Sequence, residues 1–428
     1  MASEEGQQYG SPGYRPPPLG SKPRLFYGYI IVILASLIML VIHGVFVAFG
    51  VFFNPMLTEF GWTRAVTSGA FSLSMIFIGL LGIVVGRLTD RFGPRLVLTI
   101  CGILLGLGYM LMSQISAVWQ FYLFFGVIIG FGMAGGWIPV MSTTARWFVK
   151  RRGMMSGLVV AGMGIGGVIA PPVANRLIAI YDWRTTYIIL GSVVLVTVVT
   201  AAQFLRRDPS QKGLAPHGHT DSTEYTLESG TTSLSFEEAL RRRQFWLLTA
   251  SVFCFGLLIY TIAVHIAPHT TSLGFSAATA AAILAAYGGA SILGNVVFGS
   301  VGDRIGNKWG FAICFILMSA ALLWLMPATE VWALFLFTVV FGFARGSADA
   351  LESPLTADLF GLRAHGIIYG FICFGFTIGA AIGPFLAGWI FDIRDSYQLS
   401  FLALAGVGII AFVLMAVLRP IKRPEIET

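Results

Sequence analysis

The first thing this sequence lacks is charge. Only 11% of its 428 residues are Asp, Glu, Lys or Arg, whereas charged residues make up about 25% of an ordinary soluble domain. A soluble protein of this length would need far more charged side chains to cover its surface. Hydrophobic residues reach 56%. The composition therefore excludes a soluble globular protein and indicates a chain that resides in a lipid bilayer.

Several patterns that carry chemistry are absent as well. No Gly-x-x-x-x-Gly-Lys-Ser/Thr run occurs, so no nucleotide-binding loop is predicted. The spans contain no clustered His, Asp and Ser set that would indicate an enzyme. The cysteines lack metal-like spacing and are interpreted as small packing residues; they are Cys101, Cys254, Cys314 and Cys373. The sequence predicts a protein that is not an enzyme and that holds no cofactor or metal.

Long apolar runs, by contrast, recur along almost the whole chain. About twelve of them are long enough to cross a bilayer. Because unpaired backbone groups are not tolerated in lipid, such runs must be helices, and the period-2 alternation of a membrane barrel is missing. The predicted spans are residues 27–52, 66–86, 96–116, 119–145, 153–178, 184–205, 244–266, 277–300, 309–327, 332–357, 366–390 and 397–418. The predicted fold class is an all-α membrane protein with twelve transmembrane helices.

The net charge of +7 is explained by topology. If the N-terminus is inside, most Lys and Arg residues fall on the cytoplasmic side of the predicted spans. The exceptions in the loops are Arg64, Arg176, Arg184 and Arg394. The positive-inside rule then predicts that both termini are cytoplasmic, in a cell inner or plasma membrane. Lipid is the expected surrounding, and no nucleic-acid partner is expected.

The sequence repeats itself at one offset. Gly86 to Gly93 reads GRLTDRFG and Gly299 to Gly306 reads GSVGDRIG, a shift of 299 − 86 = 213 positions. The same shift aligns the following pairs: Gly61 with Gly274, Pro55 with Pro268, Gly153 with Gly366, Gly166 with Gly379, Pro171 with Pro384 and Asp182 with Asp395. The duplication predicts two pseudo-symmetric bundles of six helices each, in parallel orientation.

Polar stretches divide the chain into domains. The middle stretch has the composition of a linker, with a short amphipathic piece near residues 236–243 that is expected on the membrane surface. The predicted domains are a disordered cytoplasmic tail over 1–24, an N-terminal six-helix bundle over 25–205, a cytoplasmic linker over 206–243, a C-terminal six-helix bundle over 244–418 and a cytoplasmic tail over 419–428.

The repeated loop resembles the signature of the major facilitator superfamily. Other segments resemble its bacterial monocarboxylate and oxalate–formate transporter branch: Tyr27-Gly28-Tyr29, residues 52–64, residues 146–153 and Asp358-Leu359-Phe360-Gly361. The resemblance covers about residues 25–420. It implies the major facilitator fold and a secondary transporter that works by alternating access around a site near the membrane midplane.

The resemblance also implies a gating role for the repeated loop. Asp90 and the neighbouring arginines are expected to pair with charges or helix ends on adjacent cytoplasmic segments and so to latch the outward-open state. The alternative is a tight, positively charged turn that only sets topology. The gating residues are Gly86, Arg87, Asp90, Arg91, Gly93, Asp303 and Arg304.

Three ionisable residues stand on one face of the tenth span. Arg345, Asp349 and Glu352 are at positions i, i+4 and i+7, and such residues inside a membrane are costly and mark function. The family resemblance places the tenth span at the central cavity. Arg345 would bind a carboxylate with its guanidinium, and Asp349 or Glu352 would carry the coupled proton. The alternative is a neutralised pair that holds helices together.

Two further sets complete the predicted substrate site. Characterised relatives in the branch carry their anion-binding arginine on the eighth span, where this sequence instead has a polar stripe of Tyr287, Ser291 and Asn295. That stripe would hydrogen-bond the substrate, or serve only helix packing. His43, in the first span, would relay protons or bind the carboxylate, or would be a buried neutral histidine.

The predicted function is secondary active transport of a small organic anion of the monocarboxylate kind. Coupling would be proton symport or exchange for another anion, and the carrier is expected to be monomeric. Two alternatives remain open: a proton-driven exporter of lipophilic compounds, and a carrier of a zwitterionic or cationic solute that uses Asp349 and Glu352 directly.

Overall fold

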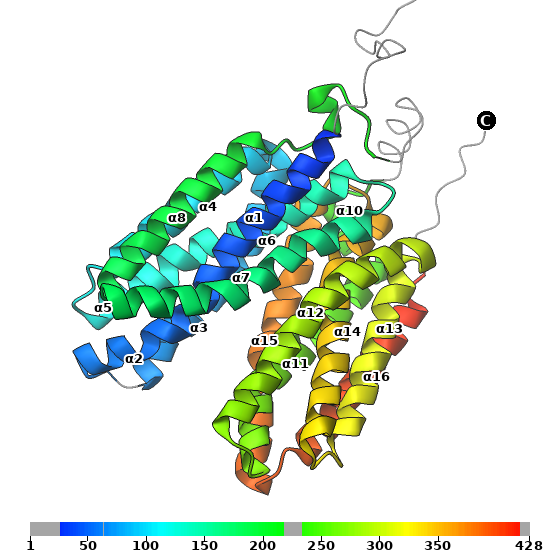
Figure 1. Ribbon diagram of the computed structural model, residues 1–428. Coiled ribbons are helices and arrows are strands. Elements are labelled where there is room, and N and C mark those ends of the chain that lie inside the picture. Colours follow the sequence, from blue (N-terminus) through cyan, green and yellow to red (C-terminus); the bar gives the residue numbers. More distant parts are fainter. Residues whose placement is uncertain (1–25, 63, 218–232, 420–428) are drawn as a thin grey trace, which may run out of the picture.

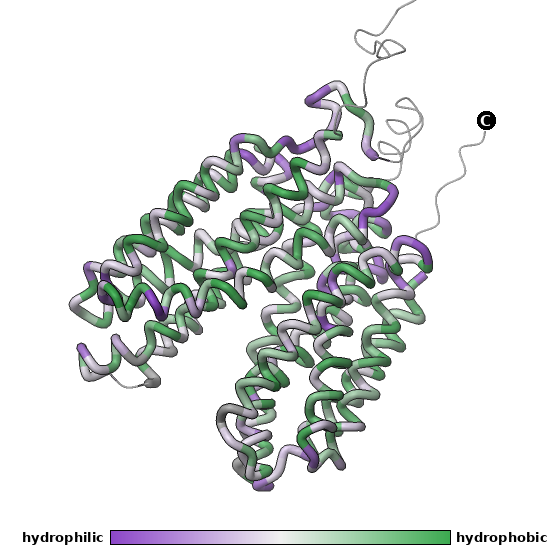
Figure 2. The backbone as a smooth tube through the Cα atoms, viewed as in Figure 1, coloured by the Kyte–Doolittle hydropathy of each residue, from purple (hydrophilic) through white to green (hydrophobic). Residues whose placement is uncertain are grey.

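The computed structural model describes residues 26–62, 64–217 and 233–419, so the predicted tail over 1–24 lies outside the described residues, as does the predicted tail over 419–428 apart from Arg419. Within these ranges, twelve helices are long and apolar enough to cross a membrane, which confirms the predicted fold class. In Figure 2 the hydrophobic residues follow the helix shafts, and the hydrophilic ones gather at helix ends and connections.

The helices form two bundles in chain order (Figure 1). The first contains α1 (Tyr27–Val47) with its continuation α2 (Phe49–Phe60), α3 (Arg64–Phe92), α4 (Pro94–Met112), α5 (Val118–Phe121) continued by the π-helical segment η1 (Tyr122–Ile129) and α6 (Gly130–Trp147), then α7 (Arg152–Ile180) and α8 (Trp183–Phe204). The second contains α11 (Arg243–Ser272), α12 (Ala277–Ile305), α13 (Asn307–Leu325), α14 (Val331–Phe360), α15 (His365–Arg394) and α16 (Gln398–Val417). Each bundle has its own apolar core.

The bundles touch at one end of the molecule and diverge toward the other (Figure 1). Their contact is made mainly by α3 against α15 and by α7 against α12. We call the end where these helices meet, near Gly86 and Gly299, the closed end, and the opposite end the open end. Gly61 and Gly274, which the repeat aligns, both end a helix at the open end with left-handed φ angles of 64° and 89°. At the closed end, the aligned Gly93 and Gly306 do the same at 83° and 89°.

The two described parts of the linker dock at matching places. After the 3-10 turn η2 (Pro209–Lys212), the His217 backbone N–H donates to the Trp147 carbonyl at 3.0 Å. On the far side, the Leu234 N–H donates to the Phe360 carbonyl at 3.0 Å, just before the short helix α10 (Phe236–Leu240). Trp147 and Phe360 are equivalent under the repeat, since 360 − 147 = 213. Each end of the linker is therefore anchored to the corresponding loop of one bundle.

Small residues allow the helices of each bundle to approach closely. A Cβ added at Gly166 in α7 would collide with the backbone carbonyl of Leu40 in α1, and one at Gly379 in α15 would collide with that of Phe253 in α11. These pairs are equivalent under the repeat. Contact of backbone with backbone leaves no flexible side chain that can move aside.

We therefore expect Gly166→Ala to destabilise the protein by about 1–3 kcal/mol, the usual cost of overpacking a close contact. A Cβ added at the adjacent Gly167 would meet no described atom within 4 Å, so Gly167→Ala is the matched control and should leave the melting temperature unchanged. The measurement is thermal unfolding of the purified variants in detergent. Equal melting temperatures for the two variants would contradict the packing argument.

Candidate functional site

Arg345 lies at the boundary between the accessible and the enclosed halves of α14. Its side chain is 22% exposed, whereas every residue from Gly346 to Ala357 is buried. The enclosed half of α14 is covered by α6 and α7 of the other bundle as well as by its own neighbours. The structure therefore places a cation halfway along a membrane-spanning helix, at the limit of solvent access.

Three side chains from the second bundle surround this cation. The Arg345 guanidinium lies over the ring of Tyr287 in α12, 5.2 Å from its centroid. Asp349, one turn along α14, has its Oδ2 3.5 Å from Arg345 Nε, and neither of these two atoms makes a hydrogen bond to a described group. Tyr260 of α11 lies close enough to interact electrostatically with both Arg345 and Asp349. Two tyrosines therefore lie beside the Arg345–Asp349 pair.

Tyr260 was not among the residues predicted from the sequence. It is one aromatic residue within an apolar span, and nothing in its spacing distinguishes it from packing residues. The signal available was its position on the seventh span, which the family resemblance assigns to the cavity.

The other two residues of the predicted stripe on α12, Ser291 and Asn295, lie where α12 packs against neighbouring helices. The Ser291 carbonyl lies directly against Gly346 of α14, and the Asn295 carbonyl lies directly against Gly157 of α7. Asn295 is 1% exposed, and its Oδ1 finds no hydrogen-bond partner among the described residues. Of the three stripe residues, the structure brings only Tyr287 to the arginine.

Glu352 is enclosed deeper in the same helix. It is 3% exposed, and its Oε1 accepts a contact from Cys373 Sγ in α15 at 3.7 Å. No described Lys, Arg or His forms an ion pair with it. An unpaired carboxylate is expensive to bury, and a bound proton would remove that cost.

His43 lies across the bundle contact from this acid. Its ring packs edge-on against Trp137 of α6 at 6.0 Å, and its Nδ1 is buried without a hydrogen bond to a described group. Trp137 Nε1 donates to Tyr369 Oη of α15 at 2.7 Å, which joins the two bundles. A chain of neighbouring side chains thus runs from His43 through Trp137 to Tyr369, which lies near Glu352.

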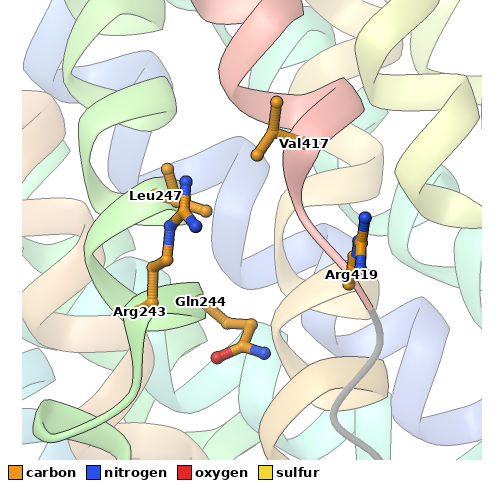
Figure 3. Close-up of a pocket in the computed structure, with 5 residues that line it drawn as sticks. All are labelled: Arg243, Gln244, Leu247, Val417 and Arg419. Atoms are coloured by element: carbon orange, nitrogen blue, oxygen red, sulfur yellow. The ribbon is translucent and has the colours of Figure 1, made fainter.

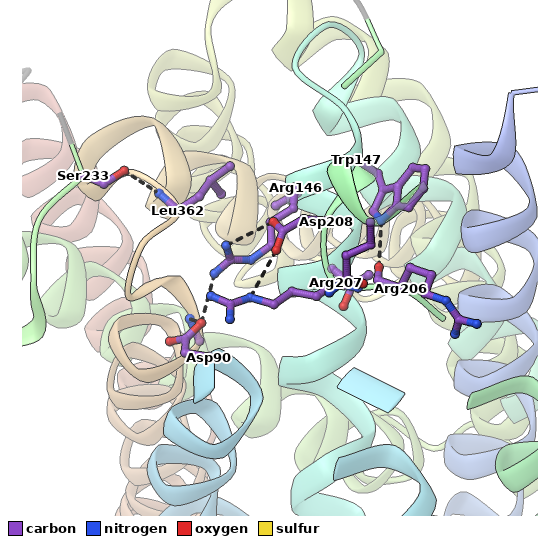
Figure 4. A network of polar contacts seen from close by, with 12 residues as sticks. Asp90, Arg146, Trp147, Arg206, Arg207, Asp208, Ser233 and Leu362 are labelled. Carbon is purple, nitrogen blue, oxygen red and sulfur yellow. Dashed lines mark hydrogen bonds and ion pairs between the residues drawn. The ribbon is translucent and has the colours of Figure 1, made fainter. Parts of the chain in front are cut away.

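The gating loop engages a helix end in the opposite bundle. Asp90, at the end of α3, accepts the backbone N–H groups of Gly366 at 3.1 Å and Ile367 at 3.0 Å in the first turn of α15. Its Oδ1 also pairs with Arg146 of α6 at 3.1 Å, and Arg146 in turn reaches Asp208 at 3.5 Å (Figure 4). Asp90 thus satisfies two of the donors that a helix leaves unpaired at its N-terminus.

The repeat makes the same contact in reverse. Asp303, at the end of α12, accepts the N–H groups of Gly153 at 2.8 Å and Met154 at 3.0 Å at the start of α7. Asp303 is the equivalent of Asp90, and Gly153 is the equivalent of Gly366. Beside each carboxylate two glycines meet: a Cβ on Gly86 would collide with the Gly366 carbonyl, and a Cβ on Gly299 would collide with the Gly153 carbonyl. We call these two contacts together the reciprocal latch.

The arginines of the gating loop do not take part in the latch. Arg87, Arg91 and Arg304 are exposed and form no ion pair with any carboxylate that the structure describes. The charges that do bridge neighbouring segments are Arg146, and Arg152 of α7, which pairs with Asp358 of α14 at 2.9 Å. Arg146 and Arg152 lie in the segment 146–153 but were not assigned to the gate from the sequence.

No grouping of three or more His, Cys, Asp or Glu side chains suited to a metal occurs within 26–62, 64–217 and 233–419. The groups that the structure brings together around Arg345 are its guanidinium, the phenols of Tyr260 and Tyr287 and the carboxylate of Asp349. Such a set can bind and orient an anion and exchange a proton with it.

Comparison with known proteins identifies the family of the chain. Residues 25–282 and 248–428 match the Major Facilitator Superfamily. Monocarboxylate transporter 12 of Mus musculus is 26% identical over 95% of this chain and 88% of its own length. The uncharacterized MFS-type transporter YhjX of Escherichia coli is 28% identical over 74% of this chain and 77% of its own.

Solved structures share the fold. The fucose:proton symporter of Escherichia coli superposes with a TM-score of 0.71 at 15% identity, covering 93% of this chain and all of that one (100%). The human organic anion transporter MFSD10 superposes with a TM-score of 0.70 at 15% identity, covering 92% and 100%.

The reciprocal latch predicts that neutralising both carboxylates opens the closed end. Spin labels at Lys150 and Arg363, exposed and equivalent positions in the two bundles, would report the separation by pulsed electron paramagnetic resonance. We expect Asp90→Asn with Asp303→Asn to shift the population toward longer distances, because a neutral amide loses both the charge-assisted hydrogen bonds and the attraction of a negative charge to the helix dipole.

The control for this measurement is Asp182→Asn. Asp182 caps α8 of its own bundle, with its Oδ1 2.6 Å from Thr185 N, and hydrogen bonds from the Thr185 backbone lower its pKa below the ordinary value. Asp182→Asn should therefore leave the distances between the labels unchanged. A distance distribution in the double variant identical to that of the control would show that the latch does not hold the bundles together.

Proposed function

The chain belongs to the Major Facilitator Superfamily and is a multi-pass membrane transporter rather than an enzyme, and on this premise we propose that its cargo is a small organic anion of the monocarboxylate kind. The observation that carries the proposal is the Arg345 guanidinium, half-way along a span, partly exposed and not hydrogen-bonded through Nε to its neighbouring acid. The names of the sequence relatives point to the same class of cargo.

Arg345 would bind the carboxylate of the cargo. A guanidinium presents parallel N–H donors that match the two oxygens of a carboxylate. The Tyr287 ring beneath it restrains the plane of the guanidinium and leaves its edge available. Tyr260 and Tyr287 would pack against a short carbon chain and offer hydroxyl groups to a substituent.

Asp349 would link the cargo to the proton. The cargo anion and Asp349 compete for one cation, since both are negative and Asp349 Oδ2 already lies 3.5 Å from Arg345 Nε. A proton on Asp349 removes the competitor and favours anion binding, so anion and proton would travel together. Glu352, enclosed one turn further along, is the second proton carrier proposed; with neither acid protonated, the same carrier would instead exchange one anion for another.

The closed end would be the cytoplasmic one. Arg146, Arg152 and Arg243 lie at this end, as expected from the positive-inside rule. The structure then represents a carrier whose site is open to the outside, with both termini in the cytoplasm. Release of the reciprocal latch would let the two bundles rock and expose Asp349 and Glu352 to the other side.

We expect Arg345→Gln to weaken anion binding by about 30-fold or more, since truncating one partner of a desolvated charge pair costs about 2–5 kcal/mol. The assay is thermal stability of the purified protein against mono- and dicarboxylates at two pH values. A ligand at 100 times its Kd stabilises the folded state by about 2.7 kcal/mol. Arg176→Gln, at an exposed position in α7, is the control.

The alternatives give different results in that screen. Stabilisation of wild type by carboxylates that persists in Arg345→Gln would remove the assigned role of this arginine. Stabilisation by amines or lipophilic compounds with none by carboxylates would replace the proposed cargo with that of a cation carrier or an exporter.

For coupling, we expect Asp349→Asn to retain anion exchange in proteoliposomes but to lose accumulation driven by a pH gradient, because an amide cannot release a proton. The two rates are measured in the same vesicles, with Glu330→Gln, which neutralises an exposed acid at the start of α14, as the control. Unchanged pH-driven accumulation would assign the proton to Glu352 or His43, which Glu352→Gln and His43→Gln would then separate.

A further inference from the structure

A second charged cavity lies far from the midplane site, at the closed end of the second bundle. It has a volume of about 290 Å³ and lies between the start of α11 and the end of α16. Its lining residues are Arg243, Gln244, Leu247, Val417 and Arg419. Figure 3 shows the two arginines on opposite sides, with the Gln244 amide between them. Tyr260, at the midplane site, is 17 residues further along α11 than Arg243, about 25 Å away at the rise of an α-helix.

Among residues 26–62, 64–217 and 233–419, no carboxylate pairs with the two arginines of this pocket, Arg243 and Arg419. In the adjacent helix α10, Glu238 is engaged locally, because its Oε2 accepts the Ser235 N–H at 2.7 Å. A third cation, Lys308 of α13, donates to the Ala416 carbonyl at 3.1 Å, next to the pocket residue Val417. Two guanidiniums and an amide facing one cavity form a donor set for a phosphate group.

The apolar part of the pocket faces lipid. Beside Leu247, which packs on the core of the second bundle, the outer surface of α16 is apolar and about half exposed, with Val417 at 46% and Val413 at 50%. Trp246 and Trp309, both about half exposed at 52% and 49%, mark the level of the membrane interface, where indole rings concentrate. A ligand that fits this cavity therefore needs an anionic group beside the arginines and acyl chains along α11 and α16.

We propose that this pocket binds the headgroup of an anionic phospholipid. The phosphate would lie between Arg243 and Arg419, Gln244 would bond a headgroup hydroxyl, and the acyl chains would run along the exposed faces of α11 and α16. The cavity is close to the lower limit of ligand pockets, about 300 Å³, which suits a headgroup rather than a whole lipid. A basic pocket between membrane helices on the side that carries the excess of arginine is suited to such lipids. The inference is independent of which cargo the transporter carries.

The test is native mass spectrometry of the full chain released from mixed lipid micelles. We expect phosphatidylglycerol to remain bound to wild type and phosphatidylcholine to be lost. Arg243→Gln combined with Arg419→Gln should weaken phosphatidylglycerol retention about tenfold or more, because both charge-assisted contacts to the phosphate are removed. Arg241→Gln combined with Arg363→Gln removes the same charge from exposed closed-end positions outside the pocket and should retain the lipid.

Three outcomes would overturn the proposal. Wild-type retention in the Arg243/Arg419 variant would mean that the pocket is not the site. Equal loss in the Arg241/Arg363 variant would mean that only general surface charge is sensed. Displacement of phosphatidylglycerol by inorganic phosphate at matched concentration would mean that the ligand is a free anion and not a lipid. As a control for folding, both double variants should have the melting temperature of the wild type in lipid-free detergent.

Discussion

Two carboxylates, Asp90 and Asp303, each bind the N-terminus of a helix in the opposite bundle, and these paired contacts lie where the two bundles meet. Asp90 binds the start of α15 and Asp303 binds the start of α7. Each uses backbone donors that a helix leaves unsatisfied, and each is favoured by the positive end of the helix dipole. Glycines at both contacts let the backbones meet. Asp349 and Glu352 on α14 are buried at this end of the molecule, where α6 and α7 of the first bundle cover them together with the helices of their own bundle.

Such a contact suits a part that must open. Each bundle keeps its own apolar core, so separating the bundles breaks a few polar contacts and small-residue packing without unfolding either core. The Trp137–Tyr369 hydrogen bond and the Arg152–Asp358 ion pair lie in the same region and would break together with the latch. The linker is anchored to the two loops that precede α7 and α15, which places it beside the same contacts.

The two halves of the repeat share their backbone features but not the charged side chains near the membrane midplane. Turns at Gly61 and Gly274, close helix contacts and the latch all recur with one offset. The midplane charges do not: the equivalent of Arg345 is Gly132, and Tyr260 and Tyr287 also belong to the second bundle. The charged residues of the midplane site, Arg345 and Asp349, thus belong to the second bundle alone, and the first bundle contributes His43 without a charged partner among the described residues of its own helices.

The sequence alone determined the fold and singled out Asp90 and Asp303, although not their partners at the starts of α15 and α7. Span length and apolar composition require helices in lipid, and a repeat with a constant offset requires two similar bundles. Arg345, Asp349 and Glu352 were identified because charge inside a span is rare and their spacing sets one face. What only the tertiary structure decided is which groups meet. Tyr260 lies beside the Arg345–Asp349 pair. The backbones of Ser291 and Asn295 pack against neighbouring helices. Asp90 pairs with Arg146 and not with Arg87 or Arg91. These outcomes depend on how helices distant in sequence rotate and approach one another, and that is governed by close packing between bundles, which leaves no periodic signal within a single helix.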